Sequence, residues 1–133
     1  MLEKIVVHTT GKSVWMDITD QVRQLVERSQ VKEGMVVVYC PHTTAGITIN
    51  EGADPDVVFD LLYGLEKISP WKDPAYRHGE GNTAAHMKAT LVGTSQTIPV
   101  TFGKMVLGMW QSIYFCEFDG PRRRNFFVKI LEG

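Results

Sequence analysis

Hydrophobic residues form short runs along the first part of this chain, and these runs predict β-strands. They cover residues 4–9, 13–18, 35–40 and 46–50. The first two flank Thr10-Gly11-Lys12, a turn-forming sequence, so we expect an opening hairpin. The third run is apolar at nearly every position, which is typical of a central strand buried on both faces.

Two other segments have the spacing of amphipathic helices. In the first, apolar residues recur at three- and four-residue intervals after Thr19 or Asp20, either of which can cap the helix. Its buried stripe consists of Val22, Leu25 and Val26. The second begins at Asp54-Pro55-Asp56, where Asp54 is expected to cap the helix and Pro55 to occupy its first turn. Its apolar face consists of Val57, Val58, Leu61, Leu62 and Leu65.

The second half of the chain is mostly β in character. Residues 69–81 are polar and contain two prolines and two glycines, so we expect a long loop there. Four apolar runs follow, at residues 87–92, 97–101, 111–118 and 125–131. Together these patterns predict an α+β fold in a single domain over residues 1–133. We expect mostly antiparallel β-sheets, with two main helices in the first half.

Composition narrows the classes of function. The net charge is -1, so no basic field favours nucleic acid, and no apolar run approaches the ~20 residues that span a bilayer. The start of the chain lacks the pattern of a signal peptide. Cys40 and Cys116 lie in apolar runs and are interpreted as buried thiols, with a disulfide as the alternative. We therefore expect a cytoplasmic protein with neither a nucleic acid nor a membrane as partner.

Three polar segments interrupt the apolar pattern, at residues 41–46, 78–86 and 117–124. They hold three of the four histidines and three consecutive arginines. Imidazole, carboxylate and guanidinium are groups that bind metals and phosphates. If the fold brings the segments together, they form a metal or anion site; if it does not, they are separate polar loops.

His78 and His86 are eight residues apart. That separation is roughly 26 Å in a strand and roughly 12 Å in a helix, too far for both rings to bind one metal at about 2 Å. The glycines between them allow the chain to fold back, which would bring the rings together. The alternative interpretation is a polar loop with one histidine at each end.

His42 directly follows the predicted central strand, where a side chain can face a pocket. Thr43 and Thr44 add hydroxyls, so this segment could bind an anion. The alternative is a bulge between two strands, in which the threonines are present for their β propensity.

The third polar segment combines acids and arginines. Glu117 and Asp119 are two residues apart at a strand end and should share a face. Gly120-Pro121 then turns the chain and delivers Arg122, Arg123 and Arg124, which could clamp a phosphate. The alternative is that these arginines pair with Glu117 or Asp119. Because neighbouring strand residues face opposite ways, one or two arginines at most can reach one site.

Two further charged residues are candidates. Glu51 has no evident capping role, so it could act as an acid, a base or a metal ligand. Lys88 alternates with His86 in a predicted strand and could face the same pocket. A solvated strand lysine is the simpler interpretation of Lys88.

The motifs HTTAGITINE (42–51), DPD (54–56), HGEGNTAAH (78–86) and GMWQSIYFCEFDGPRRR (108–124) occur in this order along the chain. Together they resemble the YjbQ-like family, which carries the label secondary thiamine-phosphate synthase. The resemblance covers nearly the whole chain. It implies a compact α+β fold assembled as a homotrimer, and a weak ability to join hydroxymethylpyrimidine diphosphate to a thiazole phosphate with release of pyrophosphate. The site residues that it implies are His42, His78, Asn82, His86, Glu117, Asp119 and Arg122.

The first hypothesis for function is therefore an enzyme acting on a small phosphorylated metabolite. The catalytic candidates are Glu51, Glu117, Asp119 and Arg122, with Arg122 and a divalent cation neutralising the departing diphosphate. The candidates for substrate binding are Thr43, Thr44, Asn82, Lys88 and Arg124. A metal would be held by His42, His78 and His86, with Glu51 or Glu117 as an additional ligand. Three imidazoles favour zinc, whereas magnesium, the usual partner of diphosphate, prefers oxygen ligands.

Three alternatives stay open at this stage. The first is a metal-dependent hydrolase of a small phosphorylated compound, which suits zinc-water chemistry. The second is a trimer that binds a metabolite or a metal without turnover. In the third, the histidines and arginines serve assembly around a symmetry axis.

Overall fold

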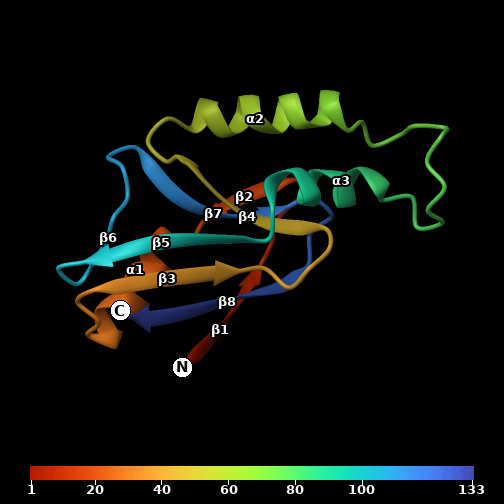
Figure 1. Cartoon of the computed structure of the whole chain (residues 1–133). Helices are drawn as coiled ribbons and strands as arrows, with labels where there is room; N and C mark the ends of the chain where they lie inside the picture. The colour runs from red at the N-terminus through yellow and green to blue at the C-terminus, as the bar shows by residue number, and fades with distance from the viewer.

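Two antiparallel sheets carry most of the chain in the computed structural model, which describes residues 1–133 (Figure 1). The larger sheet has the order β1-β8-β3-β5-β6 and the smaller sheet the order β2-β7-β4. The larger sheet consists of β1 (Leu2–His8), β8 (Arg123–Glu132), β3 (Gly34–Tyr39), β5 (Ser95–Thr101) and β6 (Lys104–Met105). The smaller sheet consists of β2 (Val14–Asp17), β7 (Gln111–Glu117) and β4 (Ala45–Glu51). All strand pairs are antiparallel, and the α+β class predicted from the sequence is confirmed.

The three helices are α1 (Thr19–Ser29), α2 (Pro55–Ile68) and α3 (Thr83–Val92). The two helices predicted in the first half are confirmed as α1 and α2. Asp54 caps α2 as expected, because its Oδ1 accepts a hydrogen bond from the backbone N–H of Asp56 at 2.9 Å. None of the three helices is both long enough and apolar enough to span a membrane.

The main hydrophobic core lies between the two sheets and includes the buried stripe of α1. Its members include Ile98 and Phe126 of the larger sheet and Ile47 and Phe115 of the smaller sheet. A second cluster lies on the opposite side of the smaller sheet, where Tyr114, Cys116 and Phe118 pack against α2 and α3. Both helices therefore cover one face of the smaller sheet, as Figure 1 shows.

The predicted opening hairpin is wrong. Strand β1 pairs with β8 in the larger sheet, whereas β2 pairs with β7 in the smaller sheet. Residues 9–13 carry the chain from one sheet to the other. The turn-forming residues were correctly recognised, but the partners of both strands lie at least 97 residues away in the sequence, which no local pattern reveals.

The predicted strand at residues 87–92 is also wrong, because this segment belongs to α3. The helix is short, and its inward side consists mainly of alanines: Ala84, Ala85 and Ala89 are buried. Alanine has the highest helix propensity, and its small side chain lets α3 pack closely on the sheet. The loop expected before it is present, since no helix or strand is formed between the end of α2 and the start of α3.

Candidate functional site

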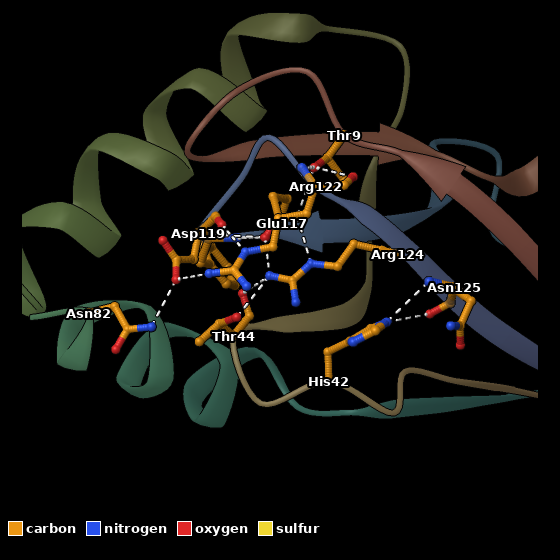
Figure 2. A network of polar contacts seen from close by, with 10 residues as sticks. Thr9, His42, Thr44, Asn82, Glu117, Asp119, Arg122, Arg124 and Asn125 are labelled. Carbon is orange, nitrogen blue, oxygen red and sulfur yellow. Dashed lines mark hydrogen bonds and ion pairs between the residues drawn. The ribbon is translucent and has the colours of Figure 1, made fainter. Parts of the chain in front are cut away.

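A buried ion pair lies at the centre of the polar residues (Figure 2). Glu117 ends β7 and has no exposed surface, and Arg124 lies near the start of β8. Arg124 donates to Oε1 of Glu117 through Nε at 2.8 Å and to Oε2 through Nη2. It also donates to the hydroxyl of Thr44 at 2.8 Å, so the third polar segment is joined to the first.

The carboxylate of Glu117 is fully engaged. Its Oε1 also accepts from the hydroxyl of Thr9 at 2.8 Å, and its Oε2 accepts from the backbone N–H groups of Phe118 and Asp119 at 3.1 and 2.9 Å. Burial opposes ionisation, but Arg124 and these donors outweigh it, so the pKa of Glu117 lies below its usual value. Glu117 is therefore an ionised structural acceptor with no free position for a substrate proton.

A second chain of contacts joins the second and third polar segments. Oδ2 of Asp119 accepts from Nδ2 of Asn82 and from Nη2 of Arg122, both at 2.8 Å. Nε of Arg122 donates to the backbone oxygen of Asp119 at 2.7 Å. The side chain of Arg122 is still 49% exposed, so its guanidinium is held in place and remains accessible to a ligand (Figure 2).

Thr9 links the two chains of contacts and was not recognised from the sequence. Its hydroxyl accepts from the backbone N–H of Arg122 at 2.8 Å, and its own N–H donates to the oxygen of Arg122 at 2.9 Å. The only signal in the sequence is a polar residue at the end of the strand predicted over residues 4–9, and such residues are common. Gly120 completes the junction, because a Cβ there would lie only 2.4 Å from the backbone oxygen of Gly11.

The N-terminus of α3 borders this network and has no side-chain cap. Asn82 precedes the helix, but its Nδ2 donates to Asp119, and its buried Oδ1 has no hydrogen-bond partner. The hydroxyl oxygen of Thr83, in the first turn, is also buried without a partner. Uncapped N–H groups at the start of a helix attract anions. The N-terminus of α3, which attracts anions, is therefore connected to the Asp119–Arg122 pair through Asn82, the residue that directly precedes the helix.

His78 and His86 come together, as the fold-back interpretation requires. Their ring centroids are 5.3 Å apart and the rings meet edge to face at 87°. The chain turns at Gly81, which has a φ of +73° and whose N–H donates to the oxygen of His78 at 3.1 Å. An open hollow of about 550 Å³ lies beside His78. It is lined by Trp71, Lys72, Asp73, Pro74, Tyr76, His78 and Gly81.

His42 makes a different contact. Its Nε2 lies 3.1 Å from both the backbone N–H and the backbone oxygen of Asn125, so it accepts from the first or donates to the second according to the ring tautomer (Figure 2). Burial lowers the pKa of His42, and the nearby Arg124 lowers it further, so the ring is neutral at pH 7. No group of three or more His, Cys, Asp or Glu side chains is arranged to hold a metal ion. The expected set of three histidine ligands is therefore not assembled within one chain.

Glu51 and Lys88 lie apart from the network. Ala45 of β4 pairs with Glu117, whereas Glu51 lies at the other end of the strand and pairs with Gln111, about 20 Å away. The expectation that Lys88 shares a pocket with His86 is wrong, because α3 is a helix and residues two apart face different ways. Lys88 is buried, and its Nζ lies 2.6 Å from Oε1 of Glu66.

The remaining candidate, Thr43, is exposed, while the adjacent Thr44 is buried against Arg124. The structure thus brings together Thr44, Asn82, Glu117, Asp119, Arg122 and Arg124, with Thr9 as an addition. The ring pair of His78 and His86 belongs to the same α3 region as Asn82.

Comparison with known proteins gives consistent matches over the whole chain. The family model described as "UPF0047 protein YjbQ-like" matches residues 3–133. The UPF0047 protein YugU of Bacillus subtilis is 49% identical over 131 residues, which cover 98% of this chain and 99% of that protein. A UPF0047 protein of Methanocaldococcus jannaschii is 50% identical over 131 residues, covering 98% of this chain and 94% of the relative.

Solved structures match equally well. A YjbQ/UPF0047 protein of Clostridium acetobutylicum superposes with a TM-score of 0.95 at 53% identity, covering 97% of this chain and 99% of that one. A protein of Sulfolobus solfataricus, described as YbjQ-like and of unknown function, has a TM-score of 0.95 at 35% identity, with coverage of 100% and 97%.

Proposed function

Because this chain belongs to the YjbQ-like UPF0047 family, we propose that it is an enzyme acting on the phosphate ester or diphosphate of a small metabolite. The reaction that the sequence resemblance implies is the weak joining of hydroxymethylpyrimidine diphosphate to a thiazole phosphate. The observation that carries the proposal is the uncapped N-terminus of α3 beside the accessible guanidinium of Arg122. Both features favour a phosphate group.

In this proposal Arg122 is the residue that touches the phosphate. Charge builds up on a diphosphate as it leaves, and a guanidinium held in advance stabilises that charge without reorganising. Asp119 holds Arg122 through two contacts, to its side-chain and backbone oxygens, and Asn82 holds Asp119. Glu117 and Arg124 act on the ligand only through the backbone and through Thr44, since their charged groups are used on each other.

A divalent metal is part of the proposal, with zinc favoured by imidazole ligands and magnesium as the alternative if phosphate oxygens supply most contacts. His78 and His86 would hold it, because their rings are already adjacent. When bound, the metal would supply positive charge at the phosphate. His42 would join only by giving up its contact with Asn125.

We also propose a homotrimer in the cytoplasm, as the sequence resemblance implies. The support in the fold is the outer face of the larger sheet, opposite the core. Here Val6, Met35, Tyr39 and Leu131 are each at least 39% exposed, and all but Val6 belong to the interior strands β8 and β3 of the five-stranded sheet. An apolar sheet face of this kind is typical of a contact between subunits.

Metal-dependent hydrolysis is the second candidate function, and the His78–His86 pair favours it, because two imidazoles suit a zinc ion that activates water. The hydrogen bonds of Glu117 favour the non-catalytic alternative. Both of its carboxylate oxygens are already engaged, which leaves the site without a free buried base. Measuring release of pyrophosphate from the two thiamine precursors, and of phosphate from simple esters, distinguishes all three.

The binding step is tested by titrating the protein with pyrophosphate in a calorimeter. We expect Arg122→Ala to weaken binding about tenfold or more, because a charge-assisted bidentate contact is lost. Arg123→Ala is the matched control, since Arg123 is exposed on the outer face of the sheet and should leave the affinity unchanged. Equal binding by wild type and Arg122→Ala would refute the proposal.

A further inference from the structure

Four residues outside the network just described form a continuous cluster between the helices and the first loop. Lys88 Nζ lies 2.6 Å from Oε1 of Glu66, and Oε2 of Glu66 accepts from the backbone N–H of Trp71 at 2.9 Å. On the other side, Nζ of Lys12 lies 3.6 Å from the centre of the Trp71 ring. We call Lys12, Glu66, Trp71 and Lys88 the clamp.

The clamp connects three segments that carry or adjoin site residues: the loop after β1, the loop between α2 and α3, and α3 itself. Lys12 belongs to the loop after β1, and its backbone oxygen accepts from the N–H of Gly120, two residues before Arg122. Trp71 lies near the start of the loop that leads to His78, and it is one of the residues that line the hollow beside that histidine. Lys88 lies in α3, the helix that carries His86.

The charged side chains of the clamp compensate one another. Lys88 is only 3% exposed, so its ammonium needs a partner, and Glu66 is the acceptor that it contacts. Burial opposes ionisation of Glu66, but Lys88, the N–H of Trp71 and Lys12 outweigh it, so the pKa of Glu66 lies below its usual value. Lys12 and Lys88 thus flank one carboxylate, and an ammonium on an aromatic face adds a further favourable contact.

A second attachment fixes the start of the same loop. Ser69 is fully buried, and its hydroxyl donates to the backbone oxygen of Ala84 at 3.2 Å, in the first turn of α3. The loop from α2 to α3 is therefore tied to α3 at Ser69 and to the first loop at Trp71. Several other residues of this loop, including His78 and Gly81, line the hollow.

We propose that Lys12, Glu66 and Lys88 are positioning residues that hold Trp71 as a wall of the hollow and thereby fix His78 beside the N-terminus of α3. The inference rests on the proposed function only for its ligand, a phosphate group. The clamp residues need not touch that ligand. Their effect is to set the relative position of His78, the start of α3 and Arg122 before a ligand binds.

The direction in which Glu66→Gln changes the affinity for pyrophosphate distinguishes a positioning role from a purely electrostatic one. Glu66→Gln removes a negative charge near an anion site, which by charge alone would strengthen pyrophosphate binding. If Glu66 positions Trp71, the same substitution weakens binding, by about threefold to tenfold, because the clamp loses its central acceptor. Calorimetric titration with pyrophosphate gives the direction.

Lys12 supplies the second variant, in case Glu66→Gln unfolds the protein. We expect Lys12→Met to weaken pyrophosphate binding about threefold to tenfold and Lys12→Arg to restore it, since arginine also stacks on an aromatic face. The matched control is Lys67→Met. Lys67 makes the same kind of contact, 4.7 Å above the ring of Tyr63, but on α2 away from the site, and its loss removes the same charge.

A measurement without ligand keeps this inference separate from the proposed function. In ligand-free protein, we expect the NMR signals of the His78 ring to shift in Lys12→Met and Glu66→Gln and to stay unchanged in Lys67→Met. If wild type binds no pyrophosphate but these shifts occur, the proposed function fails and the clamp stands. Unchanged His78 signals in both clamp variants, or tighter pyrophosphate binding by Glu66→Gln, would overturn the clamp.

Discussion

At the scale of single residues, the most consequential finding is that the two charges expected to act on a substrate neutralise each other. Glu117 and Arg124 form a buried pair in which every carboxylate position is occupied. Arg122, only two residues from Arg124, keeps an accessible guanidinium. The sequence could not decide this, because both arginines follow the same turn and only the pairing of β8 with its neighbours determines which one points inward.

The buried pair predicts a large loss of stability in Glu117→Gln. Removing one partner leaves Arg124 buried and uncompensated, at a cost of roughly 3–5 kcal/mol in the free energy of unfolding. Urea denaturation at pH 7 measures it. Glu80→Gln is the control, because the side chain of Glu80 is 71% exposed and its loss should change stability little.

The stabilising effect of Glu117 also depends on pH. Its pKa is lower in the folded state than in the unfolded chain, so the unfolded state binds the proton more readily. The contribution of Glu117 is therefore complete well above pH 4.5, the ordinary value for this group, and is lost as the pH falls through the lower folded-state pKa. The gap in stability between wild type and Glu117→Gln should narrow on acidification; a gap that stays constant from pH 7 to pH 3 would contradict the assignment.

At the scale of elements, helix α3 and the loop before it form the candidate site. The polar residues of this loop indicated function, and the glycines indicated that His78 and His86 could meet, which they do. The helix itself was missed, since the sequence from Met87 to Val92 fits a strand or a helix equally well, and its alanines show no amphipathic spacing. Because of this error, Lys88 was expected to face the same pocket as His86. Its actual partner, Glu66, lies on another helix and could not be identified from local sequence.

The turn at Gly81 predicts that alanine substitutions at Gly79 and at Gly81 have different effects on stability. A Cβ at Gly79 or at Gly81 would meet no atom within 4 Å, so space does not distinguish them, but only Gly81 has a positive φ, +73°. Gly81→Ala should therefore cost about 1–2 kcal/mol of stability and separate the two histidine rings, while Gly79→Ala should do neither. Thermal unfolding and the ring signals of His78 and His86 in NMR spectra report both effects. Equal behaviour of the two variants would show that the turn does not depend on the left-handed conformation.

At the scale of the whole molecule, two sheets enclose one core, and several apolar side chains, among them Met35, Tyr39 and Leu131, are exposed on the outer face of the larger sheet. The central position of β3 in its sheet was predicted from its run of apolar residues. Only one face of β3 is covered, however, because Met35 and Tyr39 on its other face are exposed. The placement of β1 and β2 in different sheets was not predicted, because the partner of each strand is determined by contacts between residues distant in the sequence. The fold class follows from local patterns, whereas the topology depends on these distant pairings.

For the proposed homotrimer, the exposed apolar residues on the outer face of the larger sheet predict where the subunits would meet. Tyr39→Glu places a charge on this face beside Phe127, its partner in β8, and we expect it to convert the proposed trimer into monomers in sedimentation experiments. Phe59→Glu is the control, because Phe59 is 69% exposed on α2, away from this face. A trimer that persists in Tyr39→Glu and dissociates in Phe59→Glu would place the contact on the helical side instead.

The proposal that a phosphate group binds where α3 begins is tested most directly by a crystal structure of the protein with pyrophosphate. We expect the anion at the first turn of α3, accepting hydrogen bonds from the backbone N–H groups of Thr83 and Ala84 and from the guanidinium of Arg122. Pyrophosphate bound elsewhere on the molecule, with the start of α3 and Arg122 free of it, would contradict the proposed site.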